Sequence, residues 1–423
     1  MRDLVFLSVL GLAPMLLSGT ALAATCTVSG AQVSCNGPVT GGFEAKKSVN
    51  GLNVTVNGEV SNAAGDAIRL RGEGNRVTNH GTIAGTDPAG SDGIDGGHGL
   101  TVINTGTITA TNKAIDAEEK NDLSVSNTGV IRAQDKAIRN AGGRNAALSN
   151  EGLIVSETDE GFESGDNAWI LNSGTIRASD DALQVGENAS IFNYGVIESV
   201  RRGGDEADPQ DGIDIDSGII RNYHGAVIRS DDDAAIDYDE STTASEIMNA
   251  GLISGTIGVL TDPANAAAQI IDNYGTIEGR EGIAVDLGRG DDALRLYNGS
   301  RLLGDAVMGA GDDLLYLGSA ITTGIAGGIL DGGAGFDTVQ FFQLTFADIF
   351  RVSLFGDVMS VSFRNTDNDF SLTLSNWDSF VFTDAVYGWG DVAALADVAP
   401  VPVPASGLLL AAAFGGLGLI RRR

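Results

Sequence analysis

Basic residues are scarce in this chain. It has 26 lysines and arginines against 56 aspartates and glutamates, which gives a formal net charge of −30. Proteins bind nucleic acid through basic surfaces, so the composition excludes that partner. Helical periodicity is also missing, and the 59 glycines argue against a helical solenoid. No Ser/His/Asp arrangement and no zinc-ligand spacing stands out, and the two cysteines give no sign of redox chemistry.

The start of the chain has the features of a secretory signal peptide. Arg2 supplies positive charge, residues 4–17 are largely apolar, and Ala21-Leu22-Ala23 offers a small-residue cleavage site. We therefore expect residues 1–24 to be removed and the mature chain to be exported.

The only two cysteines, Cys26 and Cys35, follow this segment directly. They flank a predicted hairpin with Ser29-Gly30 at its turn, and export makes a disulfide permissible. A pair of free thiols is the alternative, which an exported protein rarely keeps. We predict a crosslink that pins an N-terminal cap over residues 25–56.

The end of the chain carries a second targeting pattern. Residues 391–406 read as a linker that ends in Val401-Pro402-Val403-Pro404-Ala405, and residues 407–423 are apolar with a tail of three arginines. As a helix the apolar stretch spans about 21 Å, which is short for a bilayer core of about 30 Å. The order of parts resembles the VPxPA variant of the PEP-CTERM sorting signals. That resemblance implies an exosortase-type processing enzyme as a partner.

A plain C-terminal membrane anchor is the alternative to that sorting signal. In either case three arginines after the apolar stretch are expected to stay on the cytoplasmic side of the membrane. The body of the chain is therefore predicted at the cell surface or outside the cell, anchored at first by its C-terminal segment.

A repeat of the form Asn-x-Gly-x-Ile dominates the region between these two ends. It begins at Asn79-His80-Gly81-Thr82-Ile83, includes a stretched copy from Asn222 to Ile228, and ends in a degenerate copy that opens at Asn298. Its asparagines stand at positions 79, 104, 127, 150, 172, 193, 222, 249, 273 and 298, with separations of 21 to 29 residues. An apolar residue precedes each asparagine by two positions.

A third apolar position follows most of the repeat's isoleucines. Its members are Ile94, Ile115, Ile138, Leu183, Ile236 and Ile283. Three short apolar strands with Gly/Asp/Asn-rich corners make one coil of a parallel β-helix. Stacked coils would align the isoleucines and the asparagines in columns, and the repeat's glycine would permit a corner with positive φ.

The fold class predicted is therefore all-β, a right-handed parallel β-helix (β-solenoid) over residues 57–340. Roughly twelve coils would give a length of about 58 Å.

Residues 341–390 differ from this pattern because they hold nine of the fifteen phenylalanines. Alternation in residues 351–355 and 369–374 predicts antiparallel hairpins that cover the open end of the solenoid. The aromatic residues either pack in the core of this C-terminal cap or form a sugar-binding platform.

Three corners near the C-terminal end carry Gly-x-Gly-x-Asp. They open at Gly288, Gly309 and Gly333, and the last is similar to the nonapeptide of the RTX (haemolysin-type) calcium-binding repeats. The resemblance implies these Ca²⁺ ligands: Gly288, Gly290, Asp292, Gly309, Gly311, Asp313, Gly333, Gly335 and Asp337. The aspartates are 21 and 24 residues apart, wider than in that family, so ions would bridge adjacent coils. A tight turn without calcium is the alternative.

A second acidic cluster follows from the strand alternation in residues 211–216 and 235–239. If Ile213 and Ile236 point inward and stack, Asp214 lies over Asp237 and Asp216 lies over Asp239. Four outward carboxylates would form a solvated acidic face, bind a cation, or act as acid and base on a glycosidic bond.

The coils also resemble the passenger regions of autotransporter-type adhesins. That resemblance implies a structural or adhesion protein of the cell surface, biofilm or extracellular matrix, stabilised by calcium, with an extracellular polysaccharide or another cell as its partner. The contrary hypothesis is a polysaccharide lyase or glycoside hydrolase of the pectate-lyase-like β-helix class, with Asp214, Asp216, Asp237 and Asp239 as its catalytic residues.

Overall fold

The computed structural model describes residues 25–200, 209–239, 241–318, 328–364 and 369–396. The predicted signal peptide, the predicted sorting motif and the hydrophobic segment at 407–423 lie outside these residues. Within the described ranges no helix is long and apolar enough to cross a bilayer.

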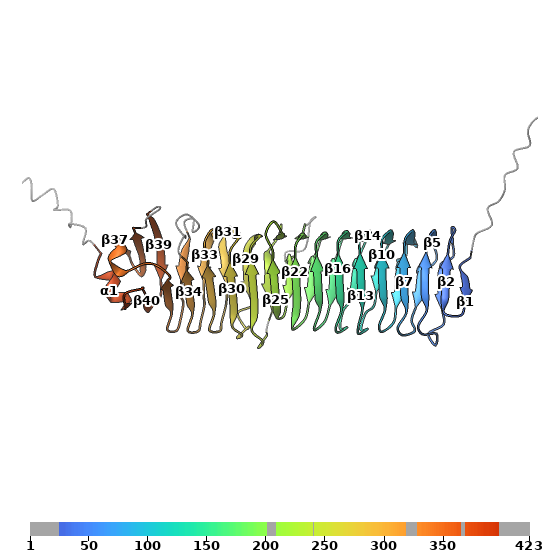
Figure 1. Cartoon of the computed structure of the whole chain (residues 1–423), viewed down its shortest axis with the longest axis horizontal. Helices are drawn as coiled ribbons and strands as arrows, with labels where there is room; N and C mark the ends of the chain where they lie inside the picture. Colours follow the sequence, from blue (N-terminus) through green and yellow to red (C-terminus); the bar gives the residue numbers. More distant parts are fainter. Residues whose placement is uncertain (1–24, 201–208, 240, 319–327, 365–368, 397–423) are drawn as a thin grey trace, which may run out of the picture.

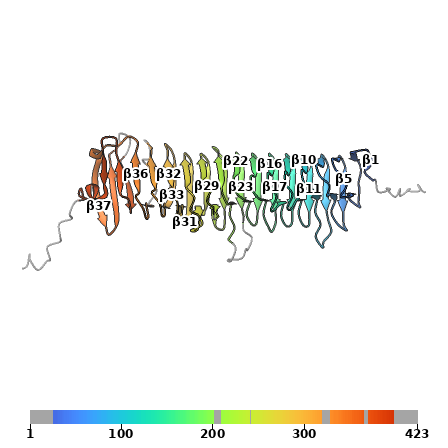
Figure 2. The ribbon, with the colours of Figure 1, turned by 90° about the horizontal axis from the view of Figure 1, so that it is seen from below.

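The chain winds into a long rod in which each turn lies on the turn before it (Figure 1). Strands make up 53% and helices 2%, in a parallel β-solenoid of about 13 turns. This confirms the predicted fold class, with one turn more than we expected. The two ends of the described chain lie at opposite ends of the rod, as a view turned by 90° also shows (Figure 2).

Each full turn contributes three strands to three parallel columns. The first column comprises β2 (Gln32–Cys35), β4 (Asn53–Val56), β7 (Arg76–Asn79), β10 (Thr101–Asn104), β13 (Ser124–Asn127), β16 (Ala147–Asn150), β19 (Trp169–Asn172), β22 (Ala189–Asn193), β25 (Gly218–Asn222), β28 (Ser245–Asn249), β30 (Gln269–Asn273), β32 (Ala293–Leu296), β34 (Leu314–Leu317), β36 (Thr338–Phe341) and β40 (Ser379–Val381).

The second and third columns belong to one continuous sheet. The second comprises β5 (Glu59–Asn62), β8 (Thr82–Gly85), β11 (Thr107–Ala110), β14 (Val130–Ala133), β17 (Leu153–Ser156), β20 (Thr175–Ala178), β23 (Val196–Ser199) and β26 (Val227–Ser230). The third comprises β3 (Phe43–Ala45), β6 (Ile68–Leu70), β9 (Ile94–Gly96), β12 (Ile115–Asp116), β15 (Ile138–Asn140), β18 (Phe162–Ser164), β21 (Leu183–Val185), β24 (Ile213–Ile215), β27 (Ala234–Tyr238), β35 (Ile329–Asp331) and β39 (Phe370–Ser375). Longer strands run through both columns in three turns: β29 (Leu252–Thr261), β31 (Thr276–Asp286) and β33 (Arg301–Val307).

The apolar positions of the repeat form continuous inward columns. In the second column Ile108 pairs with Ile83 on one side and with Ile131 on the other, and all three are fully buried. A buried isoleucine contributes roughly 2 to 5 kcal/mol relative to alanine, so such columns dominate the stability of the rod. The third column was predicted correctly except at one position, where Val285 and not Ile283 pairs with Val259. A register shift within β31 moves the inward position by two residues.

The asparagines of the repeat form the predicted ladder along one corner. The Nδ2–H of Asn79 donates to Oδ1 of Asn104 (2.8 Å), and the Nδ2–H of Asn104 donates to Oδ1 of Asn127 (2.8 Å). The same bond repeats from coil to coil as far as Asn273. All nine side chains are fully buried. Asn298, which we expected as the tenth member, is not in the ladder, because Leu296 pairs with Asn273.

In the regular copies of the repeat the glycine is required for a reason other than the positive φ that we expected, whereas Gly225 and Gly299 in the stretched and degenerate copies do have positive φ. Gly106 and Gly129 do not have positive φ values. A Cβ atom on Gly106 would instead lie 2.1 Å from the carbonyl oxygen of Gly81, and one on Gly129 would lie 2.0 Å from that of Gly106. At these regular corners the coils stack so closely that a Cβ atom would clash with the coil before.

The parallel pairing extends into both predicted caps. At the N-terminal end β1 (Thr27–Ser29) and β2 form the antiparallel hairpin, with a disulfide between Cys26 and Cys35, but β2 already pairs in parallel with β4. At the other end β39 and β40 continue the parallel columns.

Antiparallel strands cover the C-terminal end of the rod. They are β37 (Ile349–Phe355), β38 (Val358–Phe363) and β41 (Val386–Gly388), accompanied by the short helices η1 (Phe346–Asp348) and α1 (Trp389–Ala393). Phe363, Phe380 and Trp377 are buried there, and the indole N–H of Trp377 donates to the carbonyl of Leu330 (2.8 Å). Most aromatic residues of this segment therefore pack in the core of the cap.

Candidate functional site

Three aspartates of the Gly-x-Gly-x-Asp corners form a buried column. Asp292, Asp313 and Asp337 stand directly before β32, β34 and β36, which pair in register. The three side chains are at most 2% exposed. The corner motif therefore places one carboxyl group per coil inside the corner that precedes the strands of the first column.

One oxygen of each carboxyl group bonds the preceding coil. The backbone N–H of Gln269 donates to Oδ1 of Asp292 (2.6 Å), that of Asp292 donates to Asp313 (2.7 Å), and that of Asp313 donates to Asp337 (2.9 Å). The N–H of Asp337 donates to a carboxyl oxygen of Asp378 (3.0 Å), which extends the column into the cap. Asp378 could not be predicted as a member of this column, because no Gly-x-Gly pattern precedes it.

The second oxygen of each carboxyl group is buried without a hydrogen-bond partner. This holds for Oδ2 of Asp292, Asp313 and Asp337. Burial, together with the neighbouring Asp313, raises the pKa of Asp292 to about 8, although the hydrogen bond from the Gln269 N–H lowers it. Burial likewise raises the pKa of Asp313 to about 6 and raises that of Asp337. In a column of this kind each charge requires a proton or a cation.

The glycines of these corners allow the coils to stack closely, and some of their carbonyl groups accept backbone hydrogen bonds. A Cβ atom on Gly309 would lie 1.9 Å from the carbonyl oxygen of Gly288. The N–H of Ala310 donates to that carbonyl (2.9 Å), and the N–H of Ala334 donates to the carbonyl of Gly309 (2.8 Å). These two carbonyl groups keep one lone pair each for a cation. The buried Oδ2 atoms fit Ca²⁺, which prefers oxygen ligands.

The second predicted cluster is also brought together. Asp214 on β24 pairs in register with Asp237 on β27, as the stacking of Ile213 and Ile236 requires. Burial, together with the adjacent Asp214, raises the pKa of Asp237 to about 7. Asp214 also accepts a hydrogen bond from the amide of Gln184 (3.2 Å).

Asp216 and Asp239 lie at the ends of the same two strands. Burial raises the pKa of each, and the charge of Asp239 contributes to the shift of Asp216. Together with Asp214 they line a shallow hollow of about 190 Å³. The four carboxyl groups thus form one outward acidic face, as predicted.

Two buried aspartates beside this face were missed from the sequence. Asp181 and Asp211 stand two residues before the inward Leu183 and Ile213, and their side chains are 7% and 5% exposed. The N–H of Asp211 donates to Oδ1 of Asp181 (2.6 Å). Burial raises the pKa of Asp181 to about 9 and that of Asp211 to about 10, which keeps both protonated at neutral pH. Their place two residues before an inward apolar residue is the feature of the sequence that marks them.

One group of acidic oxygens converges closely enough to hold an ion, and among the described residues it is the only such group of three. It consists of Asp159, Glu160 and Asp180. The ammonium group of Lys136 lies 2.7 Å from Glu160 and 3.5 Å from Asp159. This lysine, which also pairs with Glu163 (2.9 Å), offsets only part of the negative charge of the group.

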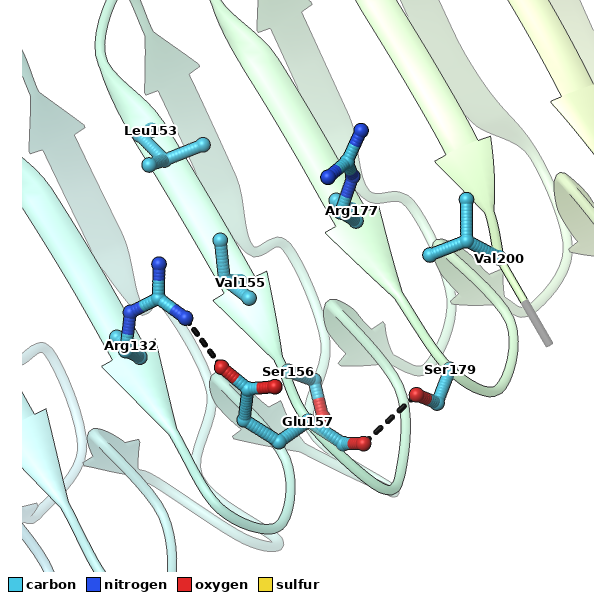
Figure 3. A pocket seen from close by; sticks show the side chains of 8 residues that line it. All are labelled: Arg132, Leu153, Val155, Ser156, Glu157, Arg177, Ser179 and Val200. Carbon is cyan, nitrogen blue, oxygen red and sulfur yellow. Dashed lines mark hydrogen bonds and ion pairs between the residues drawn. The ribbon is translucent and has the colours of Figure 1, made fainter. Parts of the chain in front are cut away.

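A further hollow of about 320 Å³ lies on the outward face of β14, β17 and β20 (Figure 3). Arg132 is paired there with Glu157, whose carbonyl oxygen accepts a hydrogen bond from Ser179 (2.7 Å). Arg177 is paired with the buried Glu198. Arg132 has its own glutamate partner, whereas Glu198 is shared by Arg177 and Arg229.

No protein-family model matches the chain, and no curated protein or solved structure is significantly similar to it.

Proposed function

We propose that this chain is an exported structural or adhesion protein of the cell surface or extracellular matrix, and that Ca²⁺ stabilises its C-terminal coils. Export would depend on residues 1–24, and an exosortase-type enzyme would process the C-terminal segment. The proposal of calcium is carried by one observation, the column of Asp292, Asp313 and Asp337 with a buried, unbonded oxygen in each coil.

The physical reason is the repulsion between stacked carboxylates. Neighbouring coils are about 4.8 Å apart, so charges repeated once per coil repel each other strongly in a buried corner. Ca²⁺ takes six to eight oxygen ligands and would supply the missing positive charge. Each ion would lie between two adjacent coils, held by the Oδ2 atoms of two neighbouring aspartates with the free lone pairs of the corner carbonyl groups.

Thermal melts of the purified chain in Ca²⁺, Mg²⁺ and chelator would test this proposal. We expect Ca²⁺ to raise the melting temperature by several degrees above that in chelator, because a ligand that binds only the folded state stabilises it. The triple variant Asp292→Asn, Asp313→Asn, Asp337→Asn should melt at the same temperature in both buffers. Identical melts of the unaltered chain in Ca²⁺ and chelator would remove calcium from the proposal.

A second candidate function is favoured by the acidic face. Asp237 stacks on Asp214 and has a pKa of about 7. In such a pair one carboxyl group can hold a proton while the other is charged, as acid and base catalysis requires. On this hypothesis the chain cleaves a polysaccharide with Asp214, Asp216, Asp237 and Asp239. Incubation with a panel of acidic polysaccharides would release new reducing ends or unsaturated products, and Asp214→Ala would lower the rate by at least about 100-fold. Absence of turnover on the whole panel would reject this candidate.

A further inference from the structure

A row of aromatic side chains follows one outer corner of the rod. The row lies in the column of residues that come directly after the asparagine-ladder position. The N–H of Tyr274 bonds the carbonyl of Asn249, that of Tyr297 bonds Asn273, and that of Phe342 bonds Leu317. These bonds place the three rings in one line along the rod.

The coil between Tyr297 and Phe342 has Gly318 in this column, and an aromatic residue of the adjacent column fills the gap. Tyr316 lies 5.7 Å from Tyr297 and 6.4 Å from Phe342, measured between ring centroids. Tyr274 and Tyr297 stack face to face with centroids 4.3 Å apart and planes inclined by 4°. The four rings, which we call the aromatic stripe, line an open hollow of about 390 Å³.

The stripe is exposed although its members are large. Tyr274 is 45% and Phe342 is 52% exposed. Farther along the same column Tyr194 and Tyr223 stack with centroids 4.0 Å apart, and Ala250 separates this pair from the stripe. Continuous exposed aromatic surface on a soluble protein marks an interaction site.

The solenoid itself does not need aromatic rings in this column. Earlier coils hold small or polar residues at the same position: His80, Thr105, Thr128, Glu151 and Ser173. Their coils stack in the same register with the same asparagine ladder beneath them. The fold therefore does not require the rings of the stripe, and contact with a binding partner explains them.

The charges beside the stripe are balanced. Arg295 pairs with Asp272 (3.2 Å), and the hydroxyl group of Tyr297 lies 3.4 Å from the same carboxylate. Burial and this carboxylate raise the pKa of Tyr297 to about 12, so its hydroxyl group stays a neutral donor. On a chain of net charge −30 such a surface favours an uncharged partner over a polyanion.

We infer that the aromatic stripe binds a neutral, extended polysaccharide of equatorially linked pyranose units. Tyr274 and Tyr297 cover one face of each other, so their outer edges and the tilted rings of Tyr316 and Phe342 would supply the apolar surface for the C–H groups of a pyranose. The tyrosine hydroxyl groups would add hydrogen bonds at the rim. Coils repeat about every 4.8 Å along the rod, and an extended pyranose chain advances by one ring over a similar distance, so successive sugars meet successive coils. The inference rests on the proposed adhesive role, for which it supplies the class of ligand.

Calorimetric titration of the full chain with cellohexaose, mannohexaose and xylohexaose tests the inference. We expect at least one of these neutral chains to bind, while an oligogalacturonate of equal length does not. Tyr274→Ala and Tyr297→Ala should each weaken binding by about tenfold. Trp169→Ala removes an aromatic side chain that is 42% exposed on β19, outside the stripe, and should leave binding unchanged.

Several outcomes would overturn the inference. These are no binding of any neutral hexasaccharide, equal binding by the stripe variants and the Trp169→Ala control, or preferred binding of the oligogalacturonate. Sedimentation of the same samples separates a further case, because dissociation of oligomers in Tyr274→Ala without sugar binding would assign the stripe to a second copy of the chain. Circular dichroism confirms folding of each variant, and Tyr297→Phe keeps the ring if Tyr297→Ala does not fold.

Cell-attachment assays and calcium melts on the same preparations keep the two proposals distinguishable. Attachment that persists without sugar binding rejects the stripe as the glycan site and leaves the adhesive role standing. Sugar binding by a chain that promotes no attachment rejects the adhesive role and leaves the stripe standing as the glycan site.

Discussion

Two columns of buried polar side chains run along this solenoid, and they fill similar corners with different chemistry. The nine asparagines from Asn79 to Asn273 form one column, and Asp292, Asp313, Asp337 and Asp378 form the other. Both repeat once per coil, and their members are almost fully withdrawn from solvent except Asp378, which is exposed. The asparagine column is closed by its own hydrogen bonds, whereas the aspartate column leaves one buried oxygen per coil unbonded at its first three positions.

The difference lies in the donors and acceptors of the two side chains. An amide group carries both, so each asparagine accepts from one neighbour and donates to the next, and no charge accumulates. A carboxylate only accepts, so each aspartate can satisfy a backbone N–H but cannot bond the next aspartate. The asparagine column is stable by itself, and the aspartate column requires protons or cations.

The largest expected effect comes from placing a carboxylate in the asparagine column. Asn127→Asp would remove the donor to Asn150 and bury an uncompensated charge, at a cost of about 3 to 5 kcal/mol. The shift in the denaturation midpoint at pH 7 measures this loss of stability. The loss should be smaller near pH 4, where the introduced carboxyl group can take up a proton.

The control for this variant is Ser126→Asp. Ser126 is the outward neighbour of Asn127 on β13, so its substitution should change stability by less than about 0.5 kcal/mol. Equal losses in the two variants would show that burial in the ladder is not the cause.

An intermediate effect is expected from pH in chelator. The folded pKa of Asp292 is about 8 and that of Asp313 about 6, both above the ordinary value of 3.8. The folded state therefore binds more protons than the unfolded state between about pH 4 and pH 8, so the stability that these groups contribute is lost as pH rises through this window. Melting temperatures in chelator should fall by several degrees from pH 5 to pH 8.

Two comparisons check the source of that decrease. Ca²⁺ should flatten the pH dependence because it replaces the protons, and the triple Asp→Asn variant should show a smaller decrease than the unaltered chain. A melting temperature in chelator that rises from pH 5 to pH 8 would contradict the assignment.

The smallest effect is expected from Asp313→Asn in chelator. The amide keeps the acceptor for the N–H of Asp292 and removes one buried charge, so we expect a gain of about 1 kcal/mol at pH 8. Asn75 shows that an amide suits this column, since its Oδ1 accepts the N–H of Leu52 (2.9 Å) in an early coil. A clear loss of stability in chelator would mean that the carboxylate has a role that an amide cannot fill.

The inward positions could be predicted from the sequence because their spacing is regular. Ile83, Ile108 and Ile131 recur at nearly constant intervals in identical contexts, and the structure stacks them directly. The prediction failed where corners change length. Two extra residues between Leu296 and Arg301 carry Asn298 into the turn, which gives the ladder position to Leu296.

The acidic face could be predicted for a similar reason, because strand alternation fixes which side chains point outward. Asp214 and Asp237 followed from the stacking of their isoleucine neighbours. Asp378 and the aromatic stripe could not be found in this way. Asp378 follows Asp337 by 41 residues and a hairpin, and the rings of the stripe adjoin only across coils.

The sequence by itself determined that the chain stacks upon itself, because no single coil can bury its own apolar residues and every coil offers the same ones. Only the tertiary structure decided which oxygen of each aspartate is bonded, which corners tolerate no Cβ atom, and which rings touch. Those outcomes depend on contacts between coils about 20 to 30 residues apart, whose register is set by corner lengths that local patterns do not encode.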